Sequence, residues 1–88
     1  MCSIMAYLGE RLSLSSLERG FAKLKHRGPD QSRSLPVPGG WLLFHRLSVM
    51  GLTEAGMQPF SLCGDAVVCN GELYGFRRMK RELFPDFP

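Results

Sequence analysis

The sequence of 88 residues lacks any long hydrophobic run. Its apolar stretches, such as residues 41–44, are too short to span a bilayer, which takes about 20 residues. The first residues also lack the basic start and extended apolar segment of a secretory signal peptide. We therefore expect one small cytoplasmic domain with no membrane partner.

Cysteine and histidine are scarce, with three and two residues respectively. An odd number of cysteines favours reduced thiols over a disulfide framework. A zinc site would have to draw on Cys2, Cys63, Cys69, His26 and His45, yet no Cys-x-x-Cys or His-x-x-x-His spacing supports one. We therefore expect no metal site in this chain.

The net charge is only +3, because the chain has 11 Lys and Arg residues and 8 Asp and Glu residues. Much of the positive excess lies in Arg77, Arg78, Lys80 and Arg81. No aromatic and basic groove pattern accompanies these residues, so they indicate a solvated helix face. Nucleic acid is therefore not an expected partner.

Apolar patterning predicts an α+β fold with the element order β, α, β, β, α and an antiparallel sheet. Residues 3–8 and 41–47 have the composition of buried strands, and residues 66–69 predict a third buried strand. The polar, proline-containing stretch 31–38 is expected to be mostly loop. Residues 48–60 contain glycine and proline and are also expected to be a loop.

Two helices are expected, both on one face of the antiparallel sheet. Apolar residues three or four positions apart predict a helix over residues 14–25, capped either by Ser13 or by Ser15 in a capping box. A second, short helix is expected over residues 76–83. The turn before the third strand is expected at Gly64-Asp65.

Cys2 directly follows the initiator methionine, and its small side chain favours removal of Met1. The residue would then carry a thiol and a free α-amine, whose pKa of about 7.7–8.0 leaves an appreciable fraction neutral near pH 7. Such an amine accepts the nucleophile's proton in enzymes with an N-terminal threonine. One residue can therefore supply both nucleophile and base.

Other residues complete a candidate site for an amide of an α-amino acid. Arg46 ends an apolar strand and suits a carboxylate, although a strand-end arginine can also simply extend to solvent. Asn70 and Gly71 can donate to a developing oxyanion, although Asn-Gly is also a hairpin-turn signal. The Glu72 carboxylate can hold a substrate ammonium group. With Cys2, this set is chemically coherent for hydrolysis of glutamine to glutamate and ammonia through a thioester.

Five motifs in series resemble the N-terminal glutaminase domain of asparagine synthetases, which are class II glutamine amidotransferases of the N-terminal-nucleophile hydrolase type. One of the motifs, Arg27-Gly28-Pro29-Asp30, would taken alone indicate a capped turn. Other class II amidotransferases share the N-terminal cysteine but are less similar at the second and third motifs. The motifs are Met1-Cys2-Ser3-Ile4, His26-Arg27-Gly28-Pro29-Asp30, His45-Arg46-Leu47-Ser48, Gln58-Pro59 and Asn70-Gly71-Glu72-Leu73-Tyr74.

This resemblance implies a role for individual residues. Cys2 is expected to be the nucleophile, and Asn70 with Gly71 is expected to form the oxyanion hole. Four residues are expected to bind glutamine. Arg46 and Glu72 would use their side chains, and Leu47 and Val49 would use their backbone.

The resemblance also implies an α-β-β-α sandwich with glutamine between two antiparallel sheets. Glutaminase domains of this family are longer, so residues 1–88 are expected to be the N-terminal part of one, with an incomplete sandwich and no synthetase domain. No cofactor is expected in this chain, since ATP and Mg²⁺ are implied only for the absent synthetase domain.

The expected partners are therefore glutamine and either the missing remainder of the enzyme or a self-associated copy that covers the open sheet edge. The alternative function is a catalytically inactive, family-derived fragment that acts as an interaction or structural module.

Overall fold

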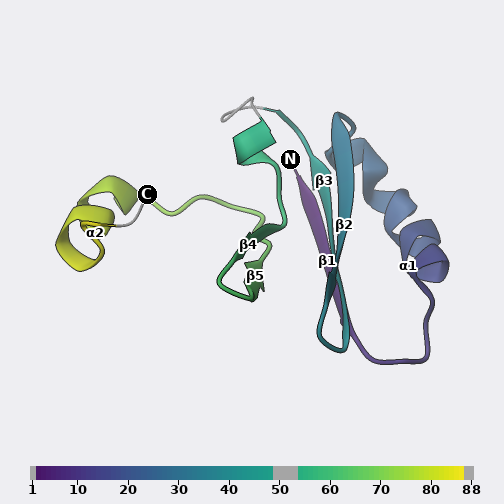
Figure 1. Ribbon diagram of the computed structural model, residues 1–88. Helices are drawn as coiled ribbons and strands as arrows, with labels where there is room; N and C mark the ends of the chain where they lie inside the picture. Colours follow the sequence, from purple (N-terminus) through teal and green to yellow (C-terminus); the bar gives the residue numbers. More distant parts are fainter. Residues whose placement is uncertain (1, 49–53, 87–88) are drawn as a thin grey trace.

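The computed structural model describes residues 2–48 and 54–86, which form two antiparallel sheets and two α-helices (Figure 1). This combination agrees with the expected α+β class. The elements in chain order are β1 (Ser3–Leu8), α1 (Leu14–Phe21), β2 (Gln31–Val37), β3 (Gly40–Arg46), β4 (Phe60–Leu62), β5 (Asp65–Val67) and α2 (Phe76–Leu83), with short 3-10 segments η1 (Ala22–Arg27) and η2 (Glu54–Gly56).

The larger sheet has the strand order β1-β3-β2, so β3 is its central strand. Its register pairs Met5 with Leu43 on one side and Ser34 with Leu43 on the other. The strand β2 corrects the prediction of a loop at residues 31–38. Its polar and proline-containing sequence is compatible with a strand because β2 lies at the sheet edge, where Pro36 need not donate to a neighbour.

The helix α1 covers one face of this sheet and closes the core. Leu17, Phe21 and Leu43 are buried there, and partly buried Met5 and Trp41 pack against them. These sheet residues share a face because successive side chains in a strand alternate. The core is therefore small and lies between α1 and the strands β1 and β3.

The start of α1 is capped by Ser13, whose side chain accepts a hydrogen bond from the Ser16 N–H at 3.2 Å. This selects Ser13 over Ser15 as the cap. The α-helix ends at Phe21, earlier than residue 25, and the chain continues as η1. Leu24 is consequently 36% exposed, because the tighter 3-10 turn rotates it away from the apolar stripe.

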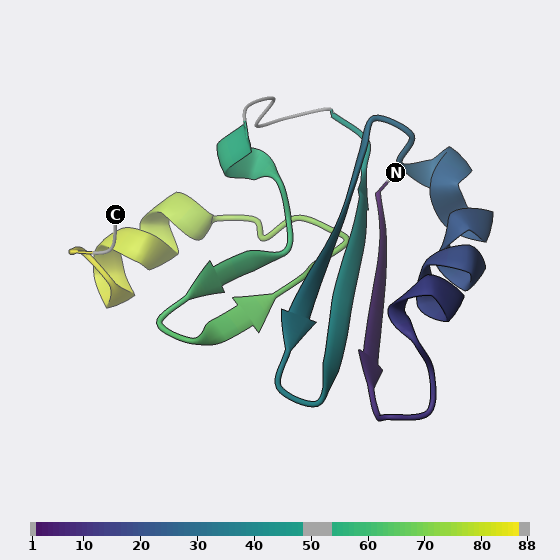
Figure 2. The same ribbon diagram turned by 45° about the vertical axis from the view of Figure 1, so that its right-hand side comes forward.

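The strands β4 and β5 form a separate hairpin on the other side of the larger sheet from α1, with α2 beyond the hairpin (Figures 1 and 2). Its turn is Cys63-Gly64, with φ values of 52° and 83°, rather than Gly64-Asp65. The strand β5 ends at Val67 and is largely exposed, not buried over residues 66–69 as predicted. No described residue covers it with a second layer, which explains this exposure.

The helix α2 forms where the sequence predicts it, but it has no buried residue. The prediction that both helices lie on one face of the sheet is wrong, because the hairpin and α2 lie on the side of the larger sheet opposite α1. None of the helices in the described ranges is long and apolar enough to cross a membrane. The apolar side chains that α2 and its flanking residues leave exposed are Leu73, Tyr74, Phe76, Met79, Leu83 and Phe84.

Replacing Leu43 by alanine should destabilise the protein strongly. Leu43 is 1% exposed and lies at the centre of the core, so L43A is expected to lower the free energy of unfolding by about 2–5 kcal/mol. Urea unfolding followed by circular dichroism measures this change. L62A, on the exposed hairpin, is the control and should change stability by less than about 0.5 kcal/mol. Equal effects of the two variants would contradict the assignment of the core.

Candidate active site

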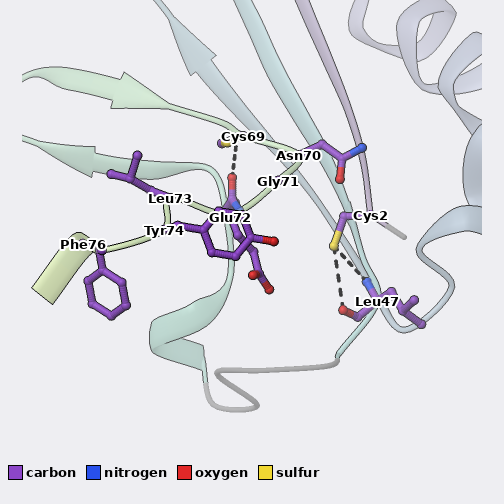
Figure 3. Close-up of a pocket in the computed structure, with 11 residues that line it drawn as sticks. Cys2, Leu47, Cys69, Asn70, Gly71, Glu72, Leu73, Tyr74 and Phe76 are labelled. Carbon is purple, nitrogen blue, oxygen red and sulfur yellow. Dashed lines mark hydrogen bonds between the residues drawn. The ribbon is translucent and has the colours of Figure 1, made fainter.

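A cavity of about 530 Å³ lies between the start of β1 and the segment that follows β5 (Figure 3). It contains five of the seven site residues expected from the sequence, which are separated by up to 70 positions in the chain. Its lining is Cys2, Leu47, Gln58, Cys69, Asn70, Gly71, Glu72, Leu73, Tyr74, Gly75 and Phe76.

Cys2 is half-buried at the start of β1, and its thiol contacts the backbone at the end of β3. Its Sγ accepts a hydrogen bond from the Leu47 N–H at 3.3 Å and lies 3.8 Å from the Leu47 carbonyl oxygen (Figure 3). Because the Ser3 hydroxyl is directed toward η1, where it donates to the Leu24 carbonyl, alternation directs Cys2 to the opposite face of the sheet. The pairing of β1 with β3 therefore delivers the thiol to the cavity.

The Arg-Gly-Pro-Asp turn before β2 holds the end of β3 in place. Gly28 is buried, with its Cα directly against the β3 backbone. The Asp30 N–H donates to the Arg46 carbonyl at 2.9 Å, and Asp30 Oδ2 accepts from the Ser48 N–H at 2.7 Å. These bonds flank Leu47 on both sides, so the turn fixes the backbone that contacts the Cys2 thiol.

Arg46 is not among the residues that line the cavity. Its side chain is on the cavity side of the sheet, is 4% exposed, and donates from Nη1 to Gln31 Oε1 at 2.9 Å. Its expected role in binding a substrate carboxylate stays a prediction. Val49, also expected at the site, lies outside the described residues.

The expected oxyanion residues follow β5, and the described residues 72–86 contain no strand that could pair with β5, so Asn-Gly does not form a hairpin turn there. The Asn70 side chain extends to the Cys2 side of the cavity (Figure 3). Gly71 has φ of 154°, a conformation that residues with a side chain rarely adopt. Glu72 is exposed and lines the same cavity.

Gln58, Cys69 and residues 73–76 also line the cavity, and the sequence did not predict this. Gln58 Oε1 accepts a hydrogen bond from the Cys69 N–H at 2.7 Å. The only sequence signal for Gln58 was its place in a family-like Gln-Pro motif. The contact itself joins residues 11 positions apart through a loop, and local patterning carries no information about such a contact.

On the α1 side of the sheet, opposite the Cys2 side, His45 is 5% exposed. Its ring stacks on Phe21 with a centroid separation of 3.7 Å, and Nδ1 lies 3.0 Å from Ser3 Oγ. Burial lowers the pKa of His45, and the positive charge of Lys25 lowers it further. His45 is thus uncharged at neutral pH and packs as part of the core.

The described residues contain no group of three or more His, Cys, Asp or Glu side chains arranged to hold a metal ion. The three cysteines form no disulfide with one another. The chemistry that this cavity offers is therefore that of a thiol, a carboxamide, backbone N–H groups and a carboxylate.

Comparison with known proteins identifies the family. The chain matches the glutamine amidotransferase domain over residues 1–86, and it belongs to this family. It is 33% identical over 91 residues to a probable glutamine-hydrolyzing asparagine synthetase of Acanthamoeba polyphaga mimivirus, and 32% identical over 89 residues to one of Dictyostelium discoideum. Each match covers 94% of this chain. These matches confirm the resemblance to the glutaminase domain of asparagine synthetases.

The chain spans 16% of the length of each of these two relatives. It is also 36% identical over 84 residues to the amidase chry2 of Gibberella zeae, a match that covers 84% of this chain and 12% of that protein. No solved structure matches the chain.

Replacing Gly28 by alanine should displace the end of β3. A Cβ at this position would lie 2.9 Å from the Arg46 nitrogen and closer still to the His45 carbonyl oxygen, so backbone atoms must move. We expect G28A to lower the free energy of unfolding by about 1–3 kcal/mol, measured by urea unfolding.

Gly20 provides the matched control for this substitution, because a Cβ there meets nothing within 4 Å. Since Gly20 lies within α1, G20A should instead stabilise the protein by about 0.5–1 kcal/mol. A G28A protein as stable as the wild type would show that the turn does not constrain β3.

The free energy of unfolding should fall as the pH drops below 6.5, the ordinary pKa of histidine. The folded protein disfavours the charged form of His45, so the unfolded chain binds the proton more tightly between pH 6.5 and the lowered pKa. The slope from this one group is at most about 1.4 kcal/mol per pH unit.

The H45F variant isolates this effect, because it removes the titrating group while keeping a ring against Phe21. Urea unfolding between pH 8 and pH 5 should show a smaller loss of stability in H45F than in the wild type, and His26 is common to both proteins. Identical pH profiles would refute the linkage to His45.

Proposed function

We propose that this chain is the glutaminase part of an asparagine synthetase-like enzyme and hydrolyses glutamine to glutamate and ammonia, with Cys2 as the nucleophile. The observation that carries the proposal is that Cys2, Asn70, Gly71 and Glu72 line one cavity although β3 and a hairpin separate them in sequence. Membership of the glutamine amidotransferase domain family supplies the substrate.

In the proposed reaction, removal of Met1 frees the Cys2 α-amine, which accepts the thiol proton. The sulfur attacks the side-chain amide carbon of glutamine, and the oxyanion that forms accepts hydrogen bonds from the Asn70 carboxamide and the Gly71 N–H. The α-ammonium returns its proton to the leaving nitrogen, the C–N bond breaks, and ammonia departs. Water then hydrolyses the thioester, which releases glutamate and restores the thiol.

The other expected residues would orient glutamine for this attack. Glu72 would hold the α-ammonium group and Arg46 the α-carboxylate, while the backbone at Leu47 and Val49 would line the pocket. The hydrogen bond that the Leu47 N–H donates to Cys2 Sγ supports this assignment, because it aims the sulfur from the same wall of the cavity.

The proposed fold is the α-β-β-α sandwich of the N-terminal-nucleophile hydrolases. Its support is the order of the elements across the molecule, since α1, the larger sheet, the β4–β5 hairpin and α2 follow one another in both views (Figures 1 and 2). In this proposal residues 1–88 are the N-terminal part of the glutaminase domain, in an enzyme of the cytoplasm.

The ammonia would serve asparagine synthesis, as the printed names of the two asparagine synthetase relatives suggest. ATP and Mg²⁺ would then act in the synthetase part of such an enzyme, and we assign no residue of this chain to them.

A second candidate function is that of an inactive, family-derived interaction module. It is favoured by the exposed apolar side chains of the hairpin and α2, which resemble a face that another protein segment covers. The remainder of the enzyme or a second copy of this chain would be the partner. The most exposed side chains of the hairpin, α2 and their flanking residues are Val67, Leu73, Tyr74, Leu83 and Phe84.

Intact-mass analysis with an electrophilic glutamine analogue, combined with an ammonia-release assay, distinguishes the two functions. The glutaminase predicts loss of Met1, one adduct, and ammonia release, with both adduct and release abolished in C2A. N70A should lower kcat by about 10²–10³, the effect of losing one oxyanion donor.

C63A is the control for nonspecific labelling, because Cys63 is exposed in the hairpin turn and does not line the cavity. It should retain the single adduct. A chain that keeps Met1, or that loses Met1 and takes no adduct, would favour the inactive module.

A further inference from the structure

Gln58 lines the cavity, yet the mechanism above assigns it no task. Its backbone is anchored on both sides, since Met57 and Pro59 are buried. The Met57 N–H donates to the Glu54 carbonyl at 2.9 Å, and the Glu54 side chain pairs with Arg33 of β2. Gln58 therefore projects from a part of the chain that is tied to the larger sheet.

The segment that carries the oxyanion donors has little packing of its own. The hairpin before it consists of three residue pairs, and both of its strands are largely exposed. The helix after it has no buried residue. Burial therefore contributes little to holding Asn70 and Gly71 in position, and specific hydrogen bonds must contribute more.

One such hydrogen bond joins Gln58 to the backbone next to Asn70. Gln58 Oε1 accepts from the Cys69 N–H at 2.7 Å, one residue before Asn70. Among the described residues, no other side chain forms a hydrogen bond to the segment 68–75. The bond thus joins the anchored wall of the cavity to the exposed wall.

We propose that Gln58 is a positioning residue, which sets the Asn70 and Gly71 donors opposite the Cys2 thiol. This inference rests on the proposed glutaminase function. Its physical basis is that oxyanion donors act only when they are preorganised, and a displacement of about 1 Å at such a site can cost about a hundredfold in rate. A neutral carboxamide suits this place, because its acceptor fixes the backbone without adding negative charge beside an oxyanion.

The first test does not depend on activity. Q58M removes the acceptor while keeping the side-chain length, so amide hydrogen exchange at Cys69, followed by NMR, should become about five- to tenfold faster. Q58E keeps an acceptor oxygen and should restore slow exchange. S61A, an exposed β4 variant with no side-chain hydrogen bond among the described residues, is the control for nonspecific loosening of the hairpin. Unchanged exchange in Q58M would overturn the proposal.

The second test measures steady-state glutamine hydrolysis. Q58M should lower kcat about ten- to hundredfold, with a smaller change in KM, because oxyanion donors act mainly in the transition state. Q58E should recover part of this loss, limited by its negative charge. A Q58M protein with wild-type kcat would overturn the positioning role even if its Cys69 exchange were faster.

The two tests separate the two possible failures. A wild-type protein without ammonia release would refute the proposed function, and the catalytic role of Gln58 would fall with it. The exchange experiment would still show in that case whether Gln58 holds the segment. Ammonia release together with unaltered kcat in Q58M would leave the proposed function intact and refute only the role of Gln58.

Discussion

The pairing of β1 with β3 is the interaction on which the rest of the structure depends. It places Met5 and Leu43 side by side under α1, which forms the core, and it places the Cys2 thiol beside the Leu47 backbone on the opposite face. Because strand side chains alternate, the register that buries the core also directs the thiol to the cavity. A one-residue slip of β1 would turn Cys2 toward α1 and expose Met5 on the opposite face. Stability and the placement of the Cys2 thiol therefore depend on one register.

The two walls of the cavity are supported by different means. The wall with Cys2 and Leu47 belongs to the packed sheet and is clamped by the Arg-Gly-Pro-Asp turn, whose Asp30 bonds to the backbone on both sides of Leu47. The wall with Asn70 and Gly71 follows an exposed hairpin and depends on the bond from Gln58. Protein segments with few buried contacts open more readily, so we expect the second wall to be the more dynamic.

The sequence predicted the elements whose local signal and tertiary setting agree. The strand at 41–47 is apolar and central, and the strand at 3–8 and the helix at 76–83 also form. The burial predicted for residues 3–8 was wrong for alternate positions, because Ile4, Ala6 and Leu8 are exposed on the face opposite α1. The prediction for residues 31–38 was wrong because an edge strand tolerates proline and polar side chains. The burial predicted for residues 66–69 was wrong because burial depends on a covering layer, which no strand specifies by its own sequence.

For the site, residue chemistry grouped Cys2, Asn70, Gly71 and Glu72, which line one cavity, and Arg46, which does not line it. The family resemblance added Leu47, which lines the same cavity. The sequence did not reveal which contacts hold these residues in place. Gln58 contacts the Cys69 backbone across a loop, and the Arg-Gly-Pro-Asp turn bonds to the backbone of Arg46 and Ser48. Reactive residues can be recognised by their type, whereas the residues that hold them in place can be recognised only from contacts in the folded chain. Among the described residues the supports are unequal: the Cys2 thiol has a packed strand behind it, whereas Gln58 provides the only side-chain hydrogen bond to the segment that carries Asn70 and Gly71. In the proposed mechanism the order of this segment would therefore limit catalysis first, because a well-placed nucleophile gains little from oxyanion donors that are out of position.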